Sequence, residues 1–223
     1  MKAADFLKHL PIFQAFSEVE LEQLEASLHL RKLPKHTLIY TPGNRSESVY
    51  FLVKGTVKIG TTFEEGREVI KNVLHPMAMF GELCLVGEEK RRDFAMSMNE
   101  EVHIYSLNAN RFQELLRNNS KLAMNLLTLI GSRLQKAEQR LESMILKDAR
   151  ERIIDFLKDS ADKRGKKVGF EMLIKHSLTQ QDIANITGTS RQTVTSVLND
   201  LRKANLIYFN RRSILIRDVS KLS

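Results

Sequence analysis

Hydrogen-bonding side chains recur at helical spacing between Thr179 and Leu201, close to the carboxyl end of the chain. The apolar residues of this segment fall on one face of a helix and the polar residues on the other. The apolar face is Val194, Val197, Leu198 and Leu201, and the polar candidates are Arg191, Gln192, Thr193, Thr195, Ser196 and Asn199. Guanidinium, amide and hydroxyl groups complement base edges in the major groove and phosphate oxygens. The chemistry to expect is recognition of double-stranded DNA.

Two short helices joined by a tight turn would position this polar face. Thr179 can cap a first helix, and Ser190 can cap the second, while Gly188 supplies the backbone freedom that the turn needs. Small Ala184 allows the two helices to cross closely. Thr179, Gln180 and Ser190, at the two helix starts, are therefore added to the candidate DNA contacts. This pattern predicts a helix-turn-helix rather than a plain helical corner.

A short hairpin should follow the second helix. Residues 206–209 and 214–216 have strand-forming sequences, and residues 210–213 form the turn between them. Arg211 and Arg212 lie at the tip of this predicted wing, where they could contact backbone phosphate.

Charge is distributed unevenly along the 223 residues, whose formal net charge is +8. Residues 149–223 hold 15 Lys and Arg against 8 Asp and Glu, a balance of +7, whereas residues 1–148 hold 20 against 19, a balance of +1. A solvated basic surface could explain this asymmetry by itself. Together with the helix-turn-helix, it favours a polyanionic partner for the last third of the chain.

A long helix is expected before the basic region. Its apolar positions follow a 3-4 spacing and are Leu127, Ile130, Leu134, Ala137, Leu141 and Met144. Such a narrow stripe on a charged helix favours a seam between two helices, and hence a homodimer, over packing against its own domain. Ser120 can cap this helix, and Asp148 can cap the next one and mark a hinge.

Before the long helix the sequence is rich in predicted β-strands. A capping box at Ser17 and Glu20 opens a helix through Leu28, and short strands broken by turn residues follow, with further strand over residues 95–107. The fold class is α+β, with an N-terminal β-roll of jelly-roll type. The predicted domains are residues 1–118, 119–148 (helix and hinge) and 149–223.

Several classes of function are excluded or disfavoured by composition. Cys84 is the single cysteine, so an internal disulfide and an iron–sulfur cluster with four cysteine ligands are excluded, and the six histidines lack metal-ligand spacing. We expect no metal site and no enzymatic activity, because no catalytic motif is present. No apolar run reaches membrane-spanning length and the start does not look like a signal peptide, so a cytoplasmic protein without membrane contact is expected.

Over its full length the chain resembles the Crp/Fnr family of bacterial transcription regulators. The resemblance rests on residues 179–201, on residues 49–59 and on the segment Phe80-Gly-Glu-Leu83. It implies a β-roll sensor, a dimer helix, a winged helix-turn-helix that binds a roughly palindromic operator, and RNA polymerase as a further partner. It assigns base reading to Arg191, Gln192 and Ser196. The last two depart from the glutamate and arginine of the cyclic-AMP-responsive members, so a different operator is expected.

The resemblance also implies an effector pocket in the β-roll. Gly81, Glu82, Leu83 and Arg92 match the family's phosphate cassette, but Asp93 replaces a hydroxyl residue, and Ala137 and Glu138 replace two hydroxyl residues of the long helix. A carboxylate beside a phosphate is repulsive and could neutralise Arg92 instead. We therefore expect an effector other than cyclic AMP. The alternative is a ligand-independent regulator with a vestigial sensor, in which Glu82 and Arg92 form a structural pair.

Overall fold

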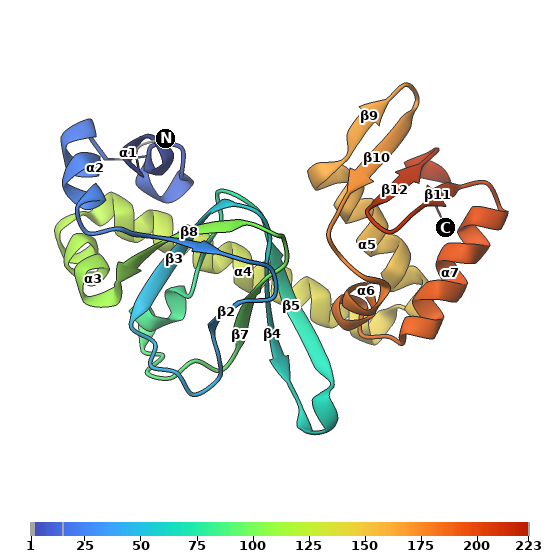
Figure 1. Cartoon of the computed structure of the whole chain (residues 1–223), viewed down its shortest axis with the longest axis horizontal. Coiled ribbons are helices and arrows are strands. Elements are labelled where there is room, and N and C mark those ends of the chain that lie inside the picture. Colours follow the sequence, from blue (N-terminus) through green and yellow to red (C-terminus); the bar gives the residue numbers. More distant parts are fainter. Residues whose placement is uncertain (1–2, 15, 223) are drawn as a thin grey trace. The chain divides into compact units, whose positions relative to one another are not determined.

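The computed structural model describes residues 3–14 and 16–222. Contacts between Cα atoms divide the chain into two compact units, residues 1–67 with 71–137, and residues 68–70 with 138–223. The division in the second half of the chain falls inside the longest helix, α4 (Ser120–Leu146). Figure 1 shows the elements coloured along the sequence.

Short helices precede the sheets of the first unit, namely α1 (Ala3–Leu7) and α2 (Glu18–Glu25), with a 3-10 turn at Pro11–Phe13. The capping box predicted at the start of α2 is confirmed. The Ser17 amide donates to Glu20 Oε2 (2.7 Å), and the Glu20 amide donates to Ser17 Oγ (3.3 Å). The helix ends at Glu25, earlier than the predicted Leu28.

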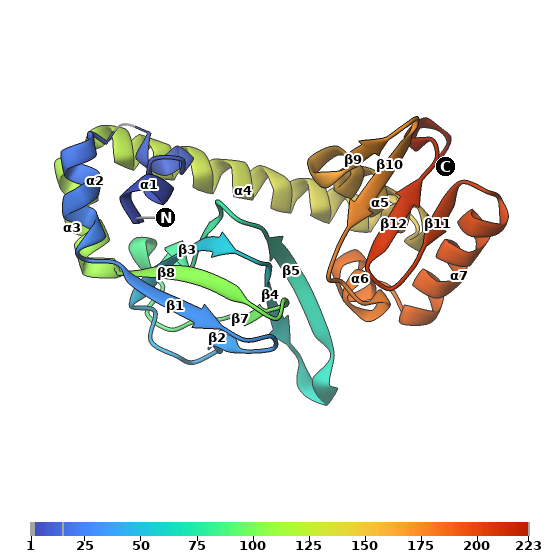
Figure 2. The same ribbon diagram turned by 45° about the horizontal axis from the view of Figure 1, so that its top comes forward.

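Two four-stranded antiparallel sheets form the β-roll, as the sequence predicts. One sheet has the order β1 (His29–Leu33), β8 (Val102–Asn108), β3 (Ser48–Lys54) and β6 (Met79–Phe80). The other has the order β2 (Leu38–Tyr40), β7 (Phe94–Ser97), β4 (Val57–Thr62) and β5 (Glu68–Leu74). Figure 2 shows the β1, β8 and β3 layer over the β2, β7 and β4 layer. Further 3-10 turns lie at Glu64–Gly66 and Glu82–Val86 in this unit and at Val219–Lys221 near the end of the second unit.

The segment predicted to be strand, residues 95–107, contributes one strand to each sheet. Strand β7 ends at Ser97, and β8 begins at Val102 after four residues of turn. The polar turn residues Asn99, Glu100 and Glu101 allow the chain to cross from one layer to the other. The apolar residues on either side then face a common interior, where Ala95 and Ile104 are fully buried.

Helix α3 (Ala109–Asn118) and the first half of α4 cover this unit. The N-cap of α4 is Asn119 rather than the predicted Ser120, since the Leu122 amide donates to Asn119 Oδ1 (3.0 Å). Leu122 and Leu126 of α4 are buried in one cluster with Phe13 and Phe112. This packing explains which face of α4 turns inward.

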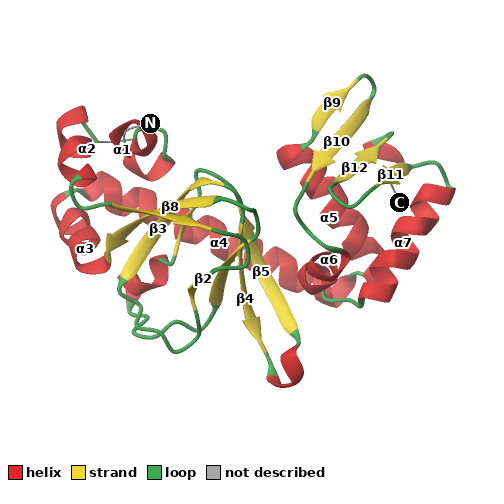
Figure 3. Cartoon of the chain, viewed as in Figure 1, coloured by secondary structure: helices red, strands yellow, loops and turns green. Residues whose placement is uncertain are grey.

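The second unit is a helix-turn-helix with a four-stranded sheet. Its helices are α5 (Ala149–Arg164), α6 (Gln180–Thr187) and α7 (Arg191–Lys203). Its sheet has the order β11 (Ile207–Phe209), β12 (Ser213–Ile216), β10 (Glu171–Lys175) and β9 (Lys166–Val168), so the predicted wing is present (Figure 3). Asp148 caps α5 in a full capping box, as predicted. Helix α5 continues to Arg164, and strand β9, which follows it directly, was not predicted.

Candidate nucleic-acid interface

Side-chain caps fix the start of both helices of the helix-turn-helix. The Asp182 amide donates to Thr179 Oγ1 (3.0 Å), and the Thr193 amide donates to Ser190 Oγ (3.0 Å). Gly188 ends α6 with φ of 63°, a left-handed conformation that glycine adopts without strain. The predicted caps and the glycine turn are thereby confirmed.

The inner face of α7 is anchored in the core of the unit. Val194 and Leu201 have no exposed surface and Leu198 has 1%, and Ala184 of α6 is also fully buried. Burial of each of the valine and leucine side chains stabilises the fold by about 1.5–3 kcal/mol. Such anchoring fixes the rotation of α7 about its axis, and therefore the direction in which its polar face points.

The outer face of α7 presents unused hydrogen-bonding groups. Arg191, Gln192 and Ser196 are exposed, and Asn199 is half-buried. Within the part of the chain that the structure describes, no hydrogen bond or ion pair engages the side chains of these four residues. Their donors and acceptors are available to a partner.

The other candidates on this surface have partners within the protein. The Thr195 hydroxyl lies 2.7 Å from Gln180 Oε1 and 2.8 Å from the Arg191 carbonyl oxygen, either of which can accept its proton. The Thr179 hydroxyl donates to Asp182 Oδ2 (2.7 Å), and the hydroxyls of Ser190 and Thr193 lie 2.8 Å apart. These residues orient α6 and α7. The Gln180 amide nitrogen stays free to donate outward, and so does one of the Ser190 and Thr193 hydroxyls, because the hydrogen bond between them uses one proton.

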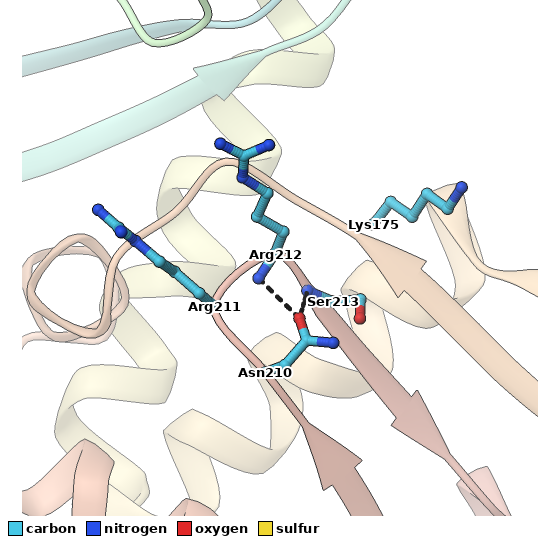
Figure 4. Close-up of a pocket in the computed structure, with 5 residues that line it drawn as sticks. All are labelled: Lys175, Asn210, Arg211, Arg212 and Ser213. Carbon is cyan, nitrogen blue, oxygen red and sulfur yellow. Dashed lines mark hydrogen bonds between the residues drawn. The ribbon is translucent and has the colours of Figure 1, made fainter.

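The wing tip is held by one amide side chain. Asn210 Oδ1 accepts from the backbone amides of Arg212 and Ser213, both at 2.9 Å, as Figure 4 shows. Arg211 and Arg212 are exposed, and together with Lys175, Asn210 and Ser213 they line a hollow. The turn thus presents two guanidinium groups whose backbone is fixed.

In the β-roll, the predicted cassette glutamate is engaged by the long helix. Glu82 is 5% exposed, and its carboxylate accepts from Arg133 Nη1, while Arg133 Nη2 donates to the Met79 carbonyl oxygen. The suggested structural pair of Glu82 with Arg92 is therefore wrong. Arg133 carries no family signature in the sequence, and only the structure brings its side chain to Glu82.

Arg92, predicted to lie in the pocket, is exposed, and its neighbour Arg91 is the buried guanidinium. Arg91 Nη1 donates to the Gly81 carbonyl oxygen (2.9 Å) and lies 3.2 Å from Glu88 Oε2. Its guanidinium carbon lies 4.6 Å from the centroid of the Tyr40 ring. Sequence reasoning missed Arg91, because counting along the chain favoured the second arginine of the pair. Strand alternation from buried Phe94 also favours Arg92, and it does not apply here, because β7 begins only at Phe94.

The remaining pocket candidates are placed as follows. Asp93 forms an ion pair with Lys71 of β5 (2.6 Å), so its predicted neutralisation of Arg92 is wrong. Leu83 is 45% exposed, and Ala137 and Glu138 are exposed on α4. The structure does not bring Arg92 and Glu82 into contact.

The predicted seam of α4 lies largely open on the single chain. Leu127 and Leu141 are 60% exposed, Leu134 is 59% exposed and Met144 is 43% exposed. Ala137 is also exposed, and Ile130 is half-buried against the cluster that contains Leu126. A row of leucines this exposed on one helix is unusual for a surface that remains in water.

Other chemistry is little supported in residues 3–14 and 16–222. No group of three or more His, Cys, Asp or Glu side chains there could hold a metal ion, and no helix there could cross a membrane. Burial raises the pKa of the Cys84 thiol to about 11, against a smaller lowering by Arg91. The thiol is therefore protonated and unreactive at neutral pH.

Comparisons with known proteins agree with both units. Residues 30–119 match the cyclic nucleotide-binding domain, and residues 151–223 match the Crp-like helix-turn-helix domain. The chain is 27% identical over 219 residues to a CRP-like cAMP-activated global transcriptional regulator of Mycobacterium tuberculosis, covering 98% of this chain and 97% of that one. It is 30% identical over 190 residues to the global nitrogen regulator of a Nostoc species, covering 85% of each.

Solved structures share the fold. FixK2 from Bradyrhizobium japonicum superposes with a TM-score of 0.78 at 21% identity, over 87% of this chain and 95% of that one. The c-di-GMP responsive global regulator CLP of Xanthomonas campestris gives a TM-score of 0.77 at 19% identity, over 90% and 99%. With both domain matches and the similarity to curated regulators, the chain belongs to the Crp/Fnr family of DNA-binding transcription regulators.

Proposed function

We propose that this regulator binds a roughly palindromic operator as a homodimer and places helix α7 of each subunit in the major groove of one half-site. The observation that carries the proposal is the exposed face of α7, where Arg191, Gln192 and Ser196 have no side-chain partner among the described residues while the opposite face is fixed in the core. Two such helices would read half-sites about 34 Å apart on one side of the duplex.

Base recognition is assigned to the three free side chains. The planar fork of Arg191 suits the O6 and N7 acceptors of guanine, and the Gln192 amide suits the N6 and N7 groups of adenine. Ser196 can donate to or accept from several bases. The remaining candidates contact phosphate or position the two helices. They are the capping residues Thr179, Ser190 and Thr193 and the hydrogen-bonded pair Gln180 and Thr195.

The wing and the local charge supply affinity that is independent of sequence. Arg211 and Arg212 extend from the wing turn, and the last third of the chain carries a balance of +7. Each phosphate that such a side chain neutralises releases condensed counterions, which makes binding dependent on salt.

Dimerisation is assigned to the exposed stripe of α4. Leu127, Leu134 and Leu141 follow one another at seven-residue intervals, as in the seam of a coiled coil. A second copy of the same helix offers a matching surface under twofold symmetry. RNA polymerase is proposed as a further partner on the strength of the family alone.

Control is assigned to a small-molecule effector in the β-roll other than cyclic AMP. The similar proteins are named as a cAMP-activated regulator, a c-di-GMP responsive regulator and a nitrogen regulator. Membership of the family therefore does not determine the effector. Asp93 is ionically paired at the position where the family has a hydroxyl residue, and Arg92 is exposed. The alternative, a ligand-independent regulator, is supported by the engagement of Glu82 with Arg133.

The DNA proposal is tested by selecting duplexes from a random pool with the purified full-length protein. The enriched duplexes are then footprinted. The expected result is a palindrome whose half-sites each contain a guanine that Arg191→Ala no longer distinguishes. That variant should lose about 10- to 100-fold in operator affinity, whereas Lys203→Ala, an exposed cation at the far end of α7, should lose little. Failure to select any palindromic sequence would overturn the proposal.

The effector proposal needs a separate titration. Operator affinity is measured with and without cyclic mononucleotides, cyclic dinucleotides and other anionic metabolites. A change with one of these, and none with cyclic AMP, supports effector control. Unchanged affinity throughout supports the ligand-independent alternative, and a response to cyclic AMP contradicts both.

A further inference from the structure

One guanidinium group joins three backbone carbonyl groups near the hinge. Arg152, on α5, donates from Nε to the Thr187 carbonyl oxygen (2.8 Å) and from Nη2 to the Gly188 carbonyl oxygen (3.2 Å). Its Nη1 donates to the Lys147 carbonyl oxygen (2.6 Å). All three nitrogens of the guanidinium are thus used, and all three partners belong to the second unit.

These carbonyls lie at the ends of two helices. Thr187 is the last residue of α6 and Gly188 is its C-cap, while Lys147 directly follows the last residue of α4. Carbonyls at a helix C-terminus lack partners within the helix and carry partial negative charge. A planar cation with five donors can satisfy carbonyls of both helix ends at once, which an ammonium group on a flexible stem does less well.

The location of Arg152 on its own helix is electrostatically unfavourable. It is the fourth residue of α5, in the first turn, where the helix dipole favours acidic rather than basic side chains. The carbonyl groups at the ends of α4 and α6 offset this cost. The guanidinium is therefore stabilised by these three hydrogen bonds and not by the dipole of α5.

A second contact connects the end of α4 with the same turn. A Cβ atom added at Gly188 would lie 3.3 Å from Cε of Met144, so the methionine side chain packs next to the turn glycine. Three residues beyond Gly188, α7 begins at Arg191 after the N-cap Ser190. The position of the turn consequently sets where the first base-reading residue lies.

We propose that Arg152 is a positioning residue for DNA recognition, which holds the turn of the helix-turn-helix at a fixed place relative to the end of the dimer helix. This inference rests on the proposed reading of DNA by α7. Arg152 itself does not contact DNA; it restrains the turn, and the restrained turn holds Arg191 in register with the half-site.

The test compares Arg152→Lys with Arg150→Lys, both of which keep the charge on the first turn of α5. Arg152→Lys should weaken operator binding by about 10- to 100-fold, as loss of charge-assisted hydrogen bonds predicts. Non-specific DNA affinity and the salt dependence of binding should stay unchanged, because no phosphate contact is lost. Backbone amides of residues 188–190 should exchange hydrogen faster. Arg150→Lys should behave as the wild type.

A residue that served folding alone would give a different pattern. It would lower the thermal midpoint and the fraction of active protein, and would leave the operator dissociation constant of that active fraction unchanged. This result, or equal operator affinities for Arg152→Lys and wild type, overturns the inference. If Arg152→Lys does not fold, Arg152→Gln, which keeps a planar donor group, is measured in the same way. Wild-type protein that binds no operator would overturn the proposed function and this inference together.

Discussion

Replacing Leu134 by alanine should weaken self-association far more than it weakens folding. Leu134 keeps 59% of its surface exposed on the single chain, so a partner helix could remove that surface from water. Complete burial of a leucine side chain is worth about 1.5–3 kcal/mol, and burial of this remaining part about 1–2 kcal/mol. Twofold symmetry doubles the effect, which gives about 2–4 kcal/mol per dimer, or a dissociation constant raised about 30- to 700-fold.

Sedimentation equilibrium over a range of protein concentrations measures this dissociation constant directly. Lys136→Ala is the matched control, because Lys136 is exposed two residues further along α4 and lies off the leucine stripe. Its dimer should have the wild-type dissociation constant, and both variants should unfold at similar denaturant concentrations. If Leu134→Ala dimerises as tightly as the wild type, the stripe is not the dimer seam and the reasoning from exposure is refuted.

Four further substitutions probe the wing, the segment between β10 and α6, the helix-turn-helix core and the β-roll. Arg211→Ala should reduce the slope of log affinity against log salt by about 1.8 for the dimer, about 0.9 for the phosphate contact of each subunit, equally for operator and random DNA. Burial lowers the pKa of His176 from 6.5, so stability should fall below that pH as the unfolded chain takes up the proton, and His176→Gln should remove this dependence in urea titrations. Leu198→Ala should cost about 2–5 kcal/mol of unfolding free energy by opening a cavity. Glu82→Gln should cost about 1–3 kcal/mol, against less than about 0.5 kcal/mol for Glu114→Gln in an exposed pair.

Each of these outcomes has a clear contrary result. An unchanged salt slope would show that Arg211 does not contact phosphate, and a variant at His176 that keeps the acid sensitivity would place its origin elsewhere. Wild-type stability after Leu198→Ala would contradict the packing of α7. Equal costs for the two glutamate substitutions would show that Arg133 holds Glu82 no more firmly than a surface pair.

Local chemistry allowed the C-terminal unit to be predicted closely. Capping residues and a turn glycine are strong signals, because they act within four residues, and the structure bears them out at Thr179, Ser190 and Gly188. Misplaced boundaries arise where two signals compete. Asn119 and Ser120 are both good N-caps, and the choice between them depends on how α3 ends.

Contacts between distant segments were not predictable in this way. Arg133 and Glu82 are 51 residues apart, and Arg152 and Thr187 are 35 residues apart. No local spacing in the sequence therefore predicts either pair. The sequence also does not show which hydroxyls of this surface have partners within the protein, because a hydroxyl on an exposed helix can face a base or a neighbouring side chain. Thr195 illustrates the second case, since its hydroxyl is within hydrogen-bonding distance of Gln180.

Helix α4 can serve both the β-roll and the proposed dimer seam. Leu122, Leu126 and Arg133 lie on the face that turns toward the β-roll, and Leu134 follows directly on the exposed stripe. Adjacent residues on a helix point about 100° apart, so a small rotation of α4 moves both faces together. A molecule that hydrogen-bonds Glu82 would have to compete with Arg133, and release of Arg133 would remove a restraint on that rotation. Under the proposed effector control Glu82 would exchange Arg133 for the ligand, whereas in the ligand-independent alternative the pair would persist.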